Sequence, residues 1–204
     1  LSKGHAALAY YCTLAHFGYF PYERVYRFGA FGSDFGCHAD RFKVSGVEAS
    51  TGSLGHGIGI AVGMALAFRI SKCPRHVYTL IGDGESNEGS VWEAVMVAAN
   101  LKLDNLSILY DNNRSQGRCL PLHEPLARFA AFGCEAIAVN GHDELALRQV
   151  LQRPQKGIPR VIVADTVKGY GCPSLVDNMF SWHRRSPTHE ELTKLMEELH
   201  ATAV

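Results

Sequence analysis

The stretch Val77-Tyr78-Thr79-Leu80-Ile81-Gly82-Asp83-Gly84 decides the fold, because an apolar run ends there in a Gly-Asp-Gly turn. A second apolar run, 106–110, ends in Asp111-Asn112-Asn113. A helix between two such strands brings both carboxyl ends to one edge of a parallel sheet. Carboxylate and amide oxygens at that edge are ligands for Mg²⁺ or Ca²⁺ rather than zinc. The glycines also let a diphosphate approach the backbone closely, beside a helix N-terminus. The alternative is an ordinary strand-to-helix turn.

Strands and helices alternate outward from this stretch. The strands are continuous apolar runs, as expected in a parallel sheet that is covered on both faces. We expect strands at 76–81, 106–110, 134–139 and 160–166, and helices at 89–102, 125–132 and 144–151. This alternation predicts an α/β fold with a doubly wound, mainly parallel sheet and helices on both faces.

The flanking segments differ in character from this core. We expect a helix at 4–17, a small-residue helix at 55–71, a loop at 168–186 and a charged helix at 189–200. The segment 28–50 has no clear period, and a long loop of this kind is usually functional or mobile. We therefore predict one domain, 1–204, in three parts: a helical and loop part (1–75), the core sheet (76–167), and a loop with a terminal helix (168–204).

Composition excludes several classes of function. Lys and Arg number 20, as do Asp and Glu, which gives no support to binding of nucleic acid or an anionic membrane. No apolar run reaches the roughly 20 residues that span a bilayer, and no signal peptide is visible. The six cysteines form no C-x-x-C pair, which favours reduced thiols in a cytoplasmic protein.

Motifs along nearly the whole chain carry a family resemblance. They are Leu1-Ser2-Lys3-Gly4-His5-Ala6, the run from Gly46 to Gly57, Gly82-Asp83-Gly84 through Glu88-Gly89, Trp92-Glu93-Ala94, Asp111-Asn112-Asn113, Lys168-Gly169-Tyr170-Gly171 and Trp182-His183. Together they resemble the thiamine-diphosphate-binding N-terminal domain of transketolases, especially of transketolases that are split into two short polypeptides.

This resemblance implies a cofactor site for thiamine diphosphate and Mg²⁺. Asp83, Asn113 and the backbone carbonyl of Ser115 would hold the metal, with the diphosphate and water completing six oxygen ligands. The implied cofactor-binding residues are Gly52, Ser53, Leu54, Asp83, Gly84, Glu88, Asn113, Ser115, Lys168 and His183. Taken alone, Gly52 could equally be a helix-entry glycine. Glu88 and Glu93 are either carboxylates favoured by a helix dipole or residues of a subunit interface.

The resemblance also implies catalytic roles for His5, His38, His183 and Lys3. The three histidines would surround the thiazolium and bind sugar hydroxyls, since neutral imidazole both donates and accepts hydrogen bonds. Lys3, with Lys168, would supply positive charge near the diphosphate. Two departures stand out: the family usually has His-Pro where this chain has His38-Ala39, and an aliphatic segment where it has 114–119.

The implied activity is transfer of a two-carbon ketol unit from a ketose to an aldehyde. No second α/β domain fits after Ser186, so we expect a complex that contains two copies of this chain and two of a separate pyrimidine-binding subunit. Two alternatives stay open. One is another thiamine-dependent enzyme, such as a carboligase that decarboxylates a 2-oxo acid or a deoxyxylulose phosphate synthase-like enzyme; the other is a non-catalytic relic that binds a partner.

Overall fold

The computed structural model describes residues 1–183 and 185–202, and four parallel strands form its centre. They are β1 (Val77–Gly82), β2 (Leu106–Asn112), β3 (Glu135–Asn140) and β4 (Arg160–Asp165), in the order β1-β2-β4-β3. The register pairs Gly82 with Asp111, and Asn112 with Asp165. The carboxyl ends of β1, β2 and β4 therefore meet at one edge, and the predicted α/β class with a parallel sheet is confirmed.

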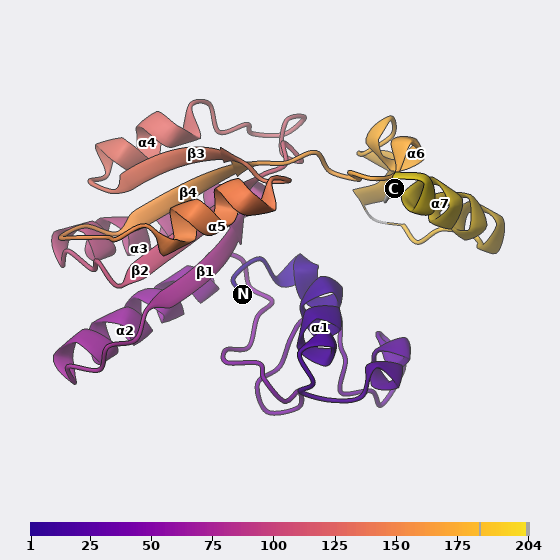
Figure 1. The fold of residues 1–204 in the computed structure, drawn as a ribbon, viewed down its shortest axis with the longest axis horizontal. Coiled ribbons are helices and arrows are strands. Elements are labelled where there is room, and N and C mark those ends of the chain that lie inside the picture. Colours follow the sequence, from indigo (N-terminus) through magenta and orange to yellow (C-terminus); the bar gives the residue numbers. More distant parts are fainter. Residues whose placement is uncertain (184, 203–204) are drawn as a thin grey trace.

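Helices cover both faces of this sheet (Figure 1). The helices α2 (His56–Ile70), α3 (Gly89–Asn100) and α4 (Pro125–Ala131) share one core with Val161 and Val163 of β4. The helix α5 (Glu144–Gln152) packs on the opposite face, against Ile162 and Ala164. Successive side chains of a strand point to opposite faces, so β4 supplies both cores. This arrangement explains why its sequence is apolar throughout.

A second, smaller core lies in the N-terminal lobe, which we define as residues 4–50. It contains the 3₁₀ helix η1 (Gly4–Ala6), α1 (Ala7–His16) and the 3₁₀ helix η2 (Tyr22–Arg27). The segment 28–50 contains no helix or strand, as predicted. Its apolar side chains nevertheless pack on α1: the rings of Tyr11 and Phe35 meet at 5.2 Å, and the Tyr11 hydroxyl donates to the Gly36 carbonyl at 3.0 Å. This packing gives the long segment a defined path without regular structure.

The C-terminal arm, residues 168–202, stands away from the sheet in Figure 1. The prediction of a plain loop at 168–186 was wrong in part, because it contains the short helices α6 (Pro173–Val176) and η4 (Ser181–His183). Such elements are too short to show a helical period in a sequence. The long helix α7 (His189–Thr202) follows, and its Glu198 accepts a hydrogen bond from the Ser174 N–H at 3.0 Å. None of the helices in the described residues is long and apolar enough to cross a membrane.

Candidate active site

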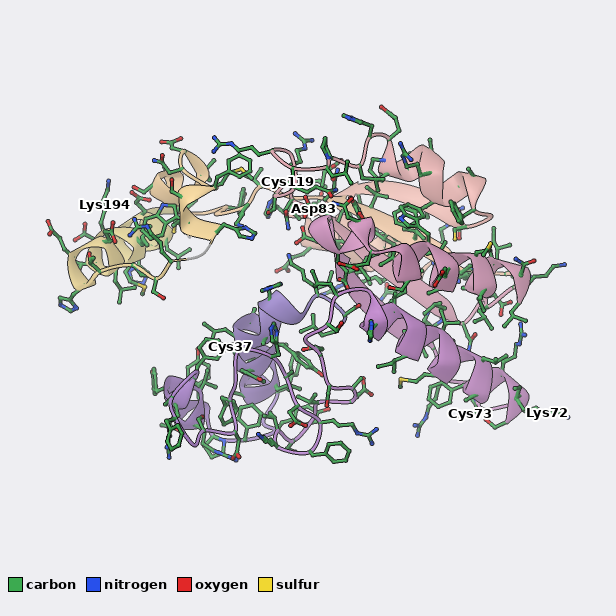
Figure 2. All side chains as sticks on the ribbon, turned by 180° about the vertical axis from the view of Figure 1, so that it is seen from behind. Cys37, Lys72, Cys73, Asp83, Cys119 and Lys194 are labelled. Atoms are coloured by element: carbon green, nitrogen blue, oxygen red, sulfur yellow. The ribbon has the colours of Figure 1, made fainter. Side chains whose placement is uncertain are left out.

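The Gly-Asp-Gly turn places Asp83 at the end of β1, where its side chain is 3% exposed. One carboxylate oxygen accepts from the N–H of Gly84 at 2.7 Å, and the other accepts from the N–H of Gln116 at 3.1 Å. Asp83 therefore connects the turn after β1 to the turn after β2. Figure 2 shows it at the edge of the sheet that lies toward both the N-terminal lobe and the C-terminal arm.

The turn after β2 brings Asn113 and Ser115 to the same edge. The Asn113 amide donates to Asp111 at 2.8 Å, and its oxygen accepts from the Ser115 N–H at 2.9 Å. Arg114 between them adopts a left-handed backbone with φ of +59°, and its carbonyl accepts from the Gly117 N–H at 3.1 Å. A tight turn therefore replaces the aliphatic segment that the family resemblance leads one to expect.

A half-buried ion pair joins the N-terminal segment to β2. The Lys3 ammonium contacts the Asp111 carboxylate, which also accepts hydrogen bonds from Thr166 and Asn113. Burial by itself raises the pKa of Asp111, but the charge of Lys3 and these hydrogen bonds outweigh it and hold the pKa below its ordinary value. Asp111 is thus an ionised anchor for residues from three segments.

Lys168 reaches the same edge from the start of the C-terminal arm. Its ammonium lies 2.7 Å from Nδ1 of His183 and 3.4 Å from the Ser115 hydroxyl. Burial, and then the charge of Lys3, lower the pKa of Lys168, while Asp83 and Asp111 act in the opposite direction. Lys3 and Lys168 are therefore close enough at the strand ends for their charges to interact, in a place suited to an anion.

The other two predicted histidines meet in the N-terminal lobe. The rings of His5 and His38 lie edge to face with centroids 5.4 Å apart. A Cβ on Gly4 would lie 3.0 Å from His38 Nδ1 and 3.1 Å from the Gly52 nitrogen, so a larger residue there would require His38 or Gly52 to shift by a few tenths of an ångström. Gly52 has a φ of +146°, a conformation that strongly favours glycine, and its α-carbon faces the His38 ring. The structure thus brings His38 beside His5 despite its departure from the family pattern.

Glu88 and Glu93 lie farther out. Both are exposed, and Glu88 stands directly before α3 without making a side-chain cap hydrogen bond. Ser53 and Leu54 lie in the turn that leads into α2, and Gly55 at its end has a φ of +77°. These residues border the strand ends rather than joining the hydrogen-bonded cluster around Asp111.

The sequence alone assigned no functional role to two residues of this edge. Asp111 is the centre of the ion-pair cluster, and Glu85 is a buried carboxylate directly beyond the Gly-Asp-Gly turn. The signal for Asp111 was its place at the carboxyl end of an apolar strand. Glu85 gave no such signal, because it lies within the polar run Glu85-Ser86-Asn87-Glu88 and its burial depends on distant segments.

The donor set at the strand ends fits a hard divalent cation. Asp83 offers a carboxylate and Asn113 an amide oxygen, and each oxygen that already accepts a hydrogen bond has a second lone pair. In the part of the chain described here, no cluster of three His, Cys, Asp or Glu side chains is placed to hold a metal. A cation at this edge would take its remaining oxygens from backbone carbonyls, water or a bound ligand.

Two clefts in the described residues lie away from the carboxyl ends of the strands. One cleft, with a volume of about 350 Å³, lies between α2 and β1, and its lining includes Tyr78 and Met64. The other, with a volume of about 380 Å³, lies near the amino end of β1, and its lining includes Arg75 and Asp104. Neither contains a predicted site residue.

Comparisons with known proteins match nearly the whole chain. Residues 1–200 match the family described as "Transketolase, thiamine diphosphate binding domain". The chain is 40% identical to an apulose-4-phosphate transketolase subunit from Actinobacillus succinogenes, over 97% of this chain and 74% of that protein. It is 38% identical to the 6-deoxy-6-sulfo-D-fructose transketolase subunit SqwG of a Clostridium species, over 98% and 74%.

A solved structure shows the same fold. The transketolase from Leishmania mexicana superposes with a TM-score of 0.78 at 25% identity. The match covers 99% of this chain but only 36% of that enzyme. The chain therefore spans about a third of a transketolase of that kind, and about three quarters of the separate subunits.

Proposed function

This chain belongs to the family of transketolase thiamine diphosphate binding domains, and from that premise we propose that it is the diphosphate-binding subunit of a two-subunit transketolase. Its reaction would be transfer of a two-carbon ketol unit from a ketose to an aldehyde acceptor. The observation that carries this proposal is the meeting of Asp83, Asn113, Lys3 and Lys168 at one edge of the sheet. The relatives named as transketolase subunits support the division into two polypeptides.

We propose that Mg²⁺ binds with the cofactor, held by Asp83, the amide oxygen of Asn113 and the backbone carbonyl of Ser115. The oxygen chemistry of this set supports the metal, since Mg²⁺ prefers carboxylate and carbonyl ligands together with phosphate oxygens. Bound thiamine diphosphate supplies the carbon centre that carries the two-carbon unit. Gly84 keeps the backbone open to the diphosphate, and Gly52, Ser53 and Leu54 support the rings of the cofactor.

The remaining residues would supply positive charge near the diphosphate and bind the oxygens of the substrate. Lys3 and Lys168 place positive charge beside the diphosphate. The short contact of Lys168 with His183 lies within the C-terminal arm and brings His183 next to that charge. His5, His38 and His183 donate and accept hydrogen bonds at hydroxyl and carbonyl oxygens of the sugar. The edge-to-face contact of His5 with His38 supports their action as a pair.

The partner we propose is a separate pyrimidine-binding subunit, in a complex with two copies of each chain. Exposed apolar side chains, including Ile60, Met96 and Val97, offer a surface on α2 and α3, the two helices that begin beside the cofactor edge. An obligate interface of this kind would bury roughly 2,000 Å² or more in total. Residues 1–204 would act as one cofactor-binding unit. The location we propose is the cytoplasm, where thiols such as the six free cysteines stay reduced.

The test compares the chain alone with the chain co-expressed with the pyrimidine-binding subunit that we propose as its partner. We expect ketol transfer from a ketose donor only in the complex, and a mass for that complex of two copies of each chain. Robust transfer by the isolated chain, free of contaminating transketolase by mass spectrometry, would refute the dependence on a partner. Condensation of a 2-oxo acid with loss of CO₂, without transfer from ketoses, would instead indicate a decarboxylating carboligase.

A further inference from the structure

Glu85 is a buried carboxylate that joins two distant segments, at Ser2 and Gly55, to the turn at the end of β1 in which it lies. It is 2% exposed, and both of its oxygens accept hydrogen bonds. One oxygen accepts from the Ser2 hydroxyl and from the Gly55 N–H at 2.9 Å. The other accepts from the Gly82 N–H at 3.1 Å. Two of these three donors are backbone groups, so the carboxylate fixes the path of the chain itself.

Each donor is next to a residue of the proposed cofactor site. Ser2 precedes Lys3, Gly55 follows Leu54, and Gly82 precedes Asp83. The N-terminal segment, the start of α2 and the end of β1 therefore share one acceptor group. A displacement of the Glu85 carboxylate would therefore move all three parts of the site at once.

The surrounding glycines show that this junction is closely packed. A Cβ on Gly55 would lie 2.3 Å from the Ser90 hydroxyl oxygen, and one on Gly57 would lie 2.5 Å from the Ser2 α-carbon. Both positions therefore need glycine to let the chain come so near. The Ser2 hydroxyl oxygen also accepts from the Ile58 N–H at 3.1 Å. The contact of Glu85 thus continues into the first turn of α2.

We infer that Glu85 is a positioning residue for the cofactor site, holding the segments of Lys3, Leu54 and Asp83 in the spacing that binds thiamine diphosphate. The inference rests on the proposed function, because it assigns the effect to that cofactor. Glu85 itself is buried and its hydrogen bonds are to protein groups, so we assign it no contact with a reacting atom. Its effect is on affinity, through the position of backbone groups.

The substitution Glu85→Gln isolates this role, because it keeps the size of the side chain. An amide has one acceptor oxygen, whereas the three donors need acceptors on both oxygens. Whichever way the amide turns, its NH₂ group faces the N–H of Gly55 or of Gly82. An unsatisfied buried donor is costly, so one segment moves away. We expect thiamine diphosphate to bind the Glu85→Gln complex about 10-fold or more weakly.

The experiment is titration calorimetry of thiamine diphosphate, with Mg²⁺, into the complex of this chain with its partner subunit. For Glu85→Gln we expect the loss of affinity and faster hydrogen exchange at the amide of Gly55 or of Gly82, whichever loses its acceptor. Turnover at saturating cofactor should stay within about 3-fold of wild type, because the reacting groups are intact. Unchanged affinity in a complex whose wild type binds the cofactor would overturn the inference. Absence of binding in the wild type would instead contradict the proposed function.

A matched control separates positioning from general loss of stability. Glu135 also accepts hydrogen bonds from a buried partner, Arg160, but at the opposite end of the sheet. Glu135→Gln should lower the melting temperature without changing cofactor affinity. An equal loss of affinity in both variants would overturn the inference. Should Glu85→Gln fail to assemble, Ser2→Ala removes one donor to Glu85, together with the acceptor of the Ile58 N–H, and leaves the two backbone donors in place. It should weaken binding about 3-fold, and unchanged affinity there would also overturn the inference.

Discussion

The carboxylate of Asp83 accepts a hydrogen bond from the backbone N–H of Gln116, with 3.1 Å between Oδ2 and the nitrogen. This contact crosses from the turn after β1 to the turn after β2, so that one side chain fixes the relative position of both strand ends. It leaves lone pairs of the carboxylate for a cation. Asp83 thereby combines a structural role with the ligand role that we propose for it.

The first prediction follows from this double role. Asp83→Ala should weaken Mg²⁺-dependent binding of thiamine diphosphate by at least about 100-fold, because a charged ligand is lost. Calorimetry on the assembled complex, with and without a chelator, measures it. Asp143→Ala is the matched control: it removes the carboxylate that accepts from the Ala146 N–H at 2.9 Å at the start of α5. That variant should lose about 1 kcal/mol of stability and keep its affinity for the cofactor.

The second prediction concerns the histidines. His5→Ala and His183→Ala should each lower kcat by about 10²–10⁴-fold while changing cofactor affinity far less, as is typical of a lost acid–base group. Steady-state kinetics with an active ketose donor measure the effect. His200→Ala, on the exposed side of α7, should leave kcat unchanged. Wild-type turnover in both single variants would remove these histidines from the site.

The third prediction uses Tyr110, whose buried hydroxyl lies near Ser86 and Gln116 but makes no hydrogen bond of good geometry within the described residues. Burial raises the pKa of Tyr110 from its ordinary value of 10.0 to about 12. A raised pKa in the folded state means that the stability present below pH 10 is lost as pH rises from 10 to 12. Tyr110→Phe should therefore lose less stability than wild type across this range.

Urea unfolding of the wild type and the variant at pH 8 and pH 11 measures the difference. At pH 8, Tyr110→Phe should be as stable as wild type or more stable, since it removes an unpaired buried hydroxyl. Tyr26→Phe is the control, because Tyr26 is 82% exposed and the substitution should change neither value. Equal losses between pH 8 and pH 11 in wild type and Tyr110→Phe would contradict the burial of this hydroxyl.

The fourth prediction concerns the amino end of the sheet, away from the site. The buried guanidinium of Arg160 donates to Glu135 at 2.9 Å and to three carbonyls at the end of α5 and in the loop that follows, those of Val150, Arg153 and Pro154. Arg160→Lys should lower the free energy of unfolding by about 2–4 kcal/mol, because an ammonium cannot reach all of these acceptors. Denaturant unfolding measures it, and cofactor affinity should not change. A loss below about 0.5 kcal/mol would show that the loop does not need this network.

Much of this fold follows from local patterns. Apolar runs of strand length and the Gly-Asp-Gly turn predict β1 and β2, and the alternation with helices predicts a parallel sheet. The short helices α6 and η4 were missed, since elements of so few residues show no period. The candidate residues that follow strands, Asp83 and Asn113, were found because the carboxyl ends of parallel strands share an edge.

By itself, the sequence determined the order of strands and helices, the turn chemistry and the kinds of ligand atoms at the strand ends, because each depends on residues near one another in the chain. Only the tertiary structure decided the strand order β1-β2-β4-β3, the pairing of Lys3 with Asp111 and the contact of His5 with His38. Only the tertiary structure shows that Glu85, one acid in a polar run of the sequence, is buried and accepts a hydrogen bond from the distant Gly55. Burial and long-range hydrogen bonds depend on segments that only the folded chain brings together, so a local pattern cannot encode them.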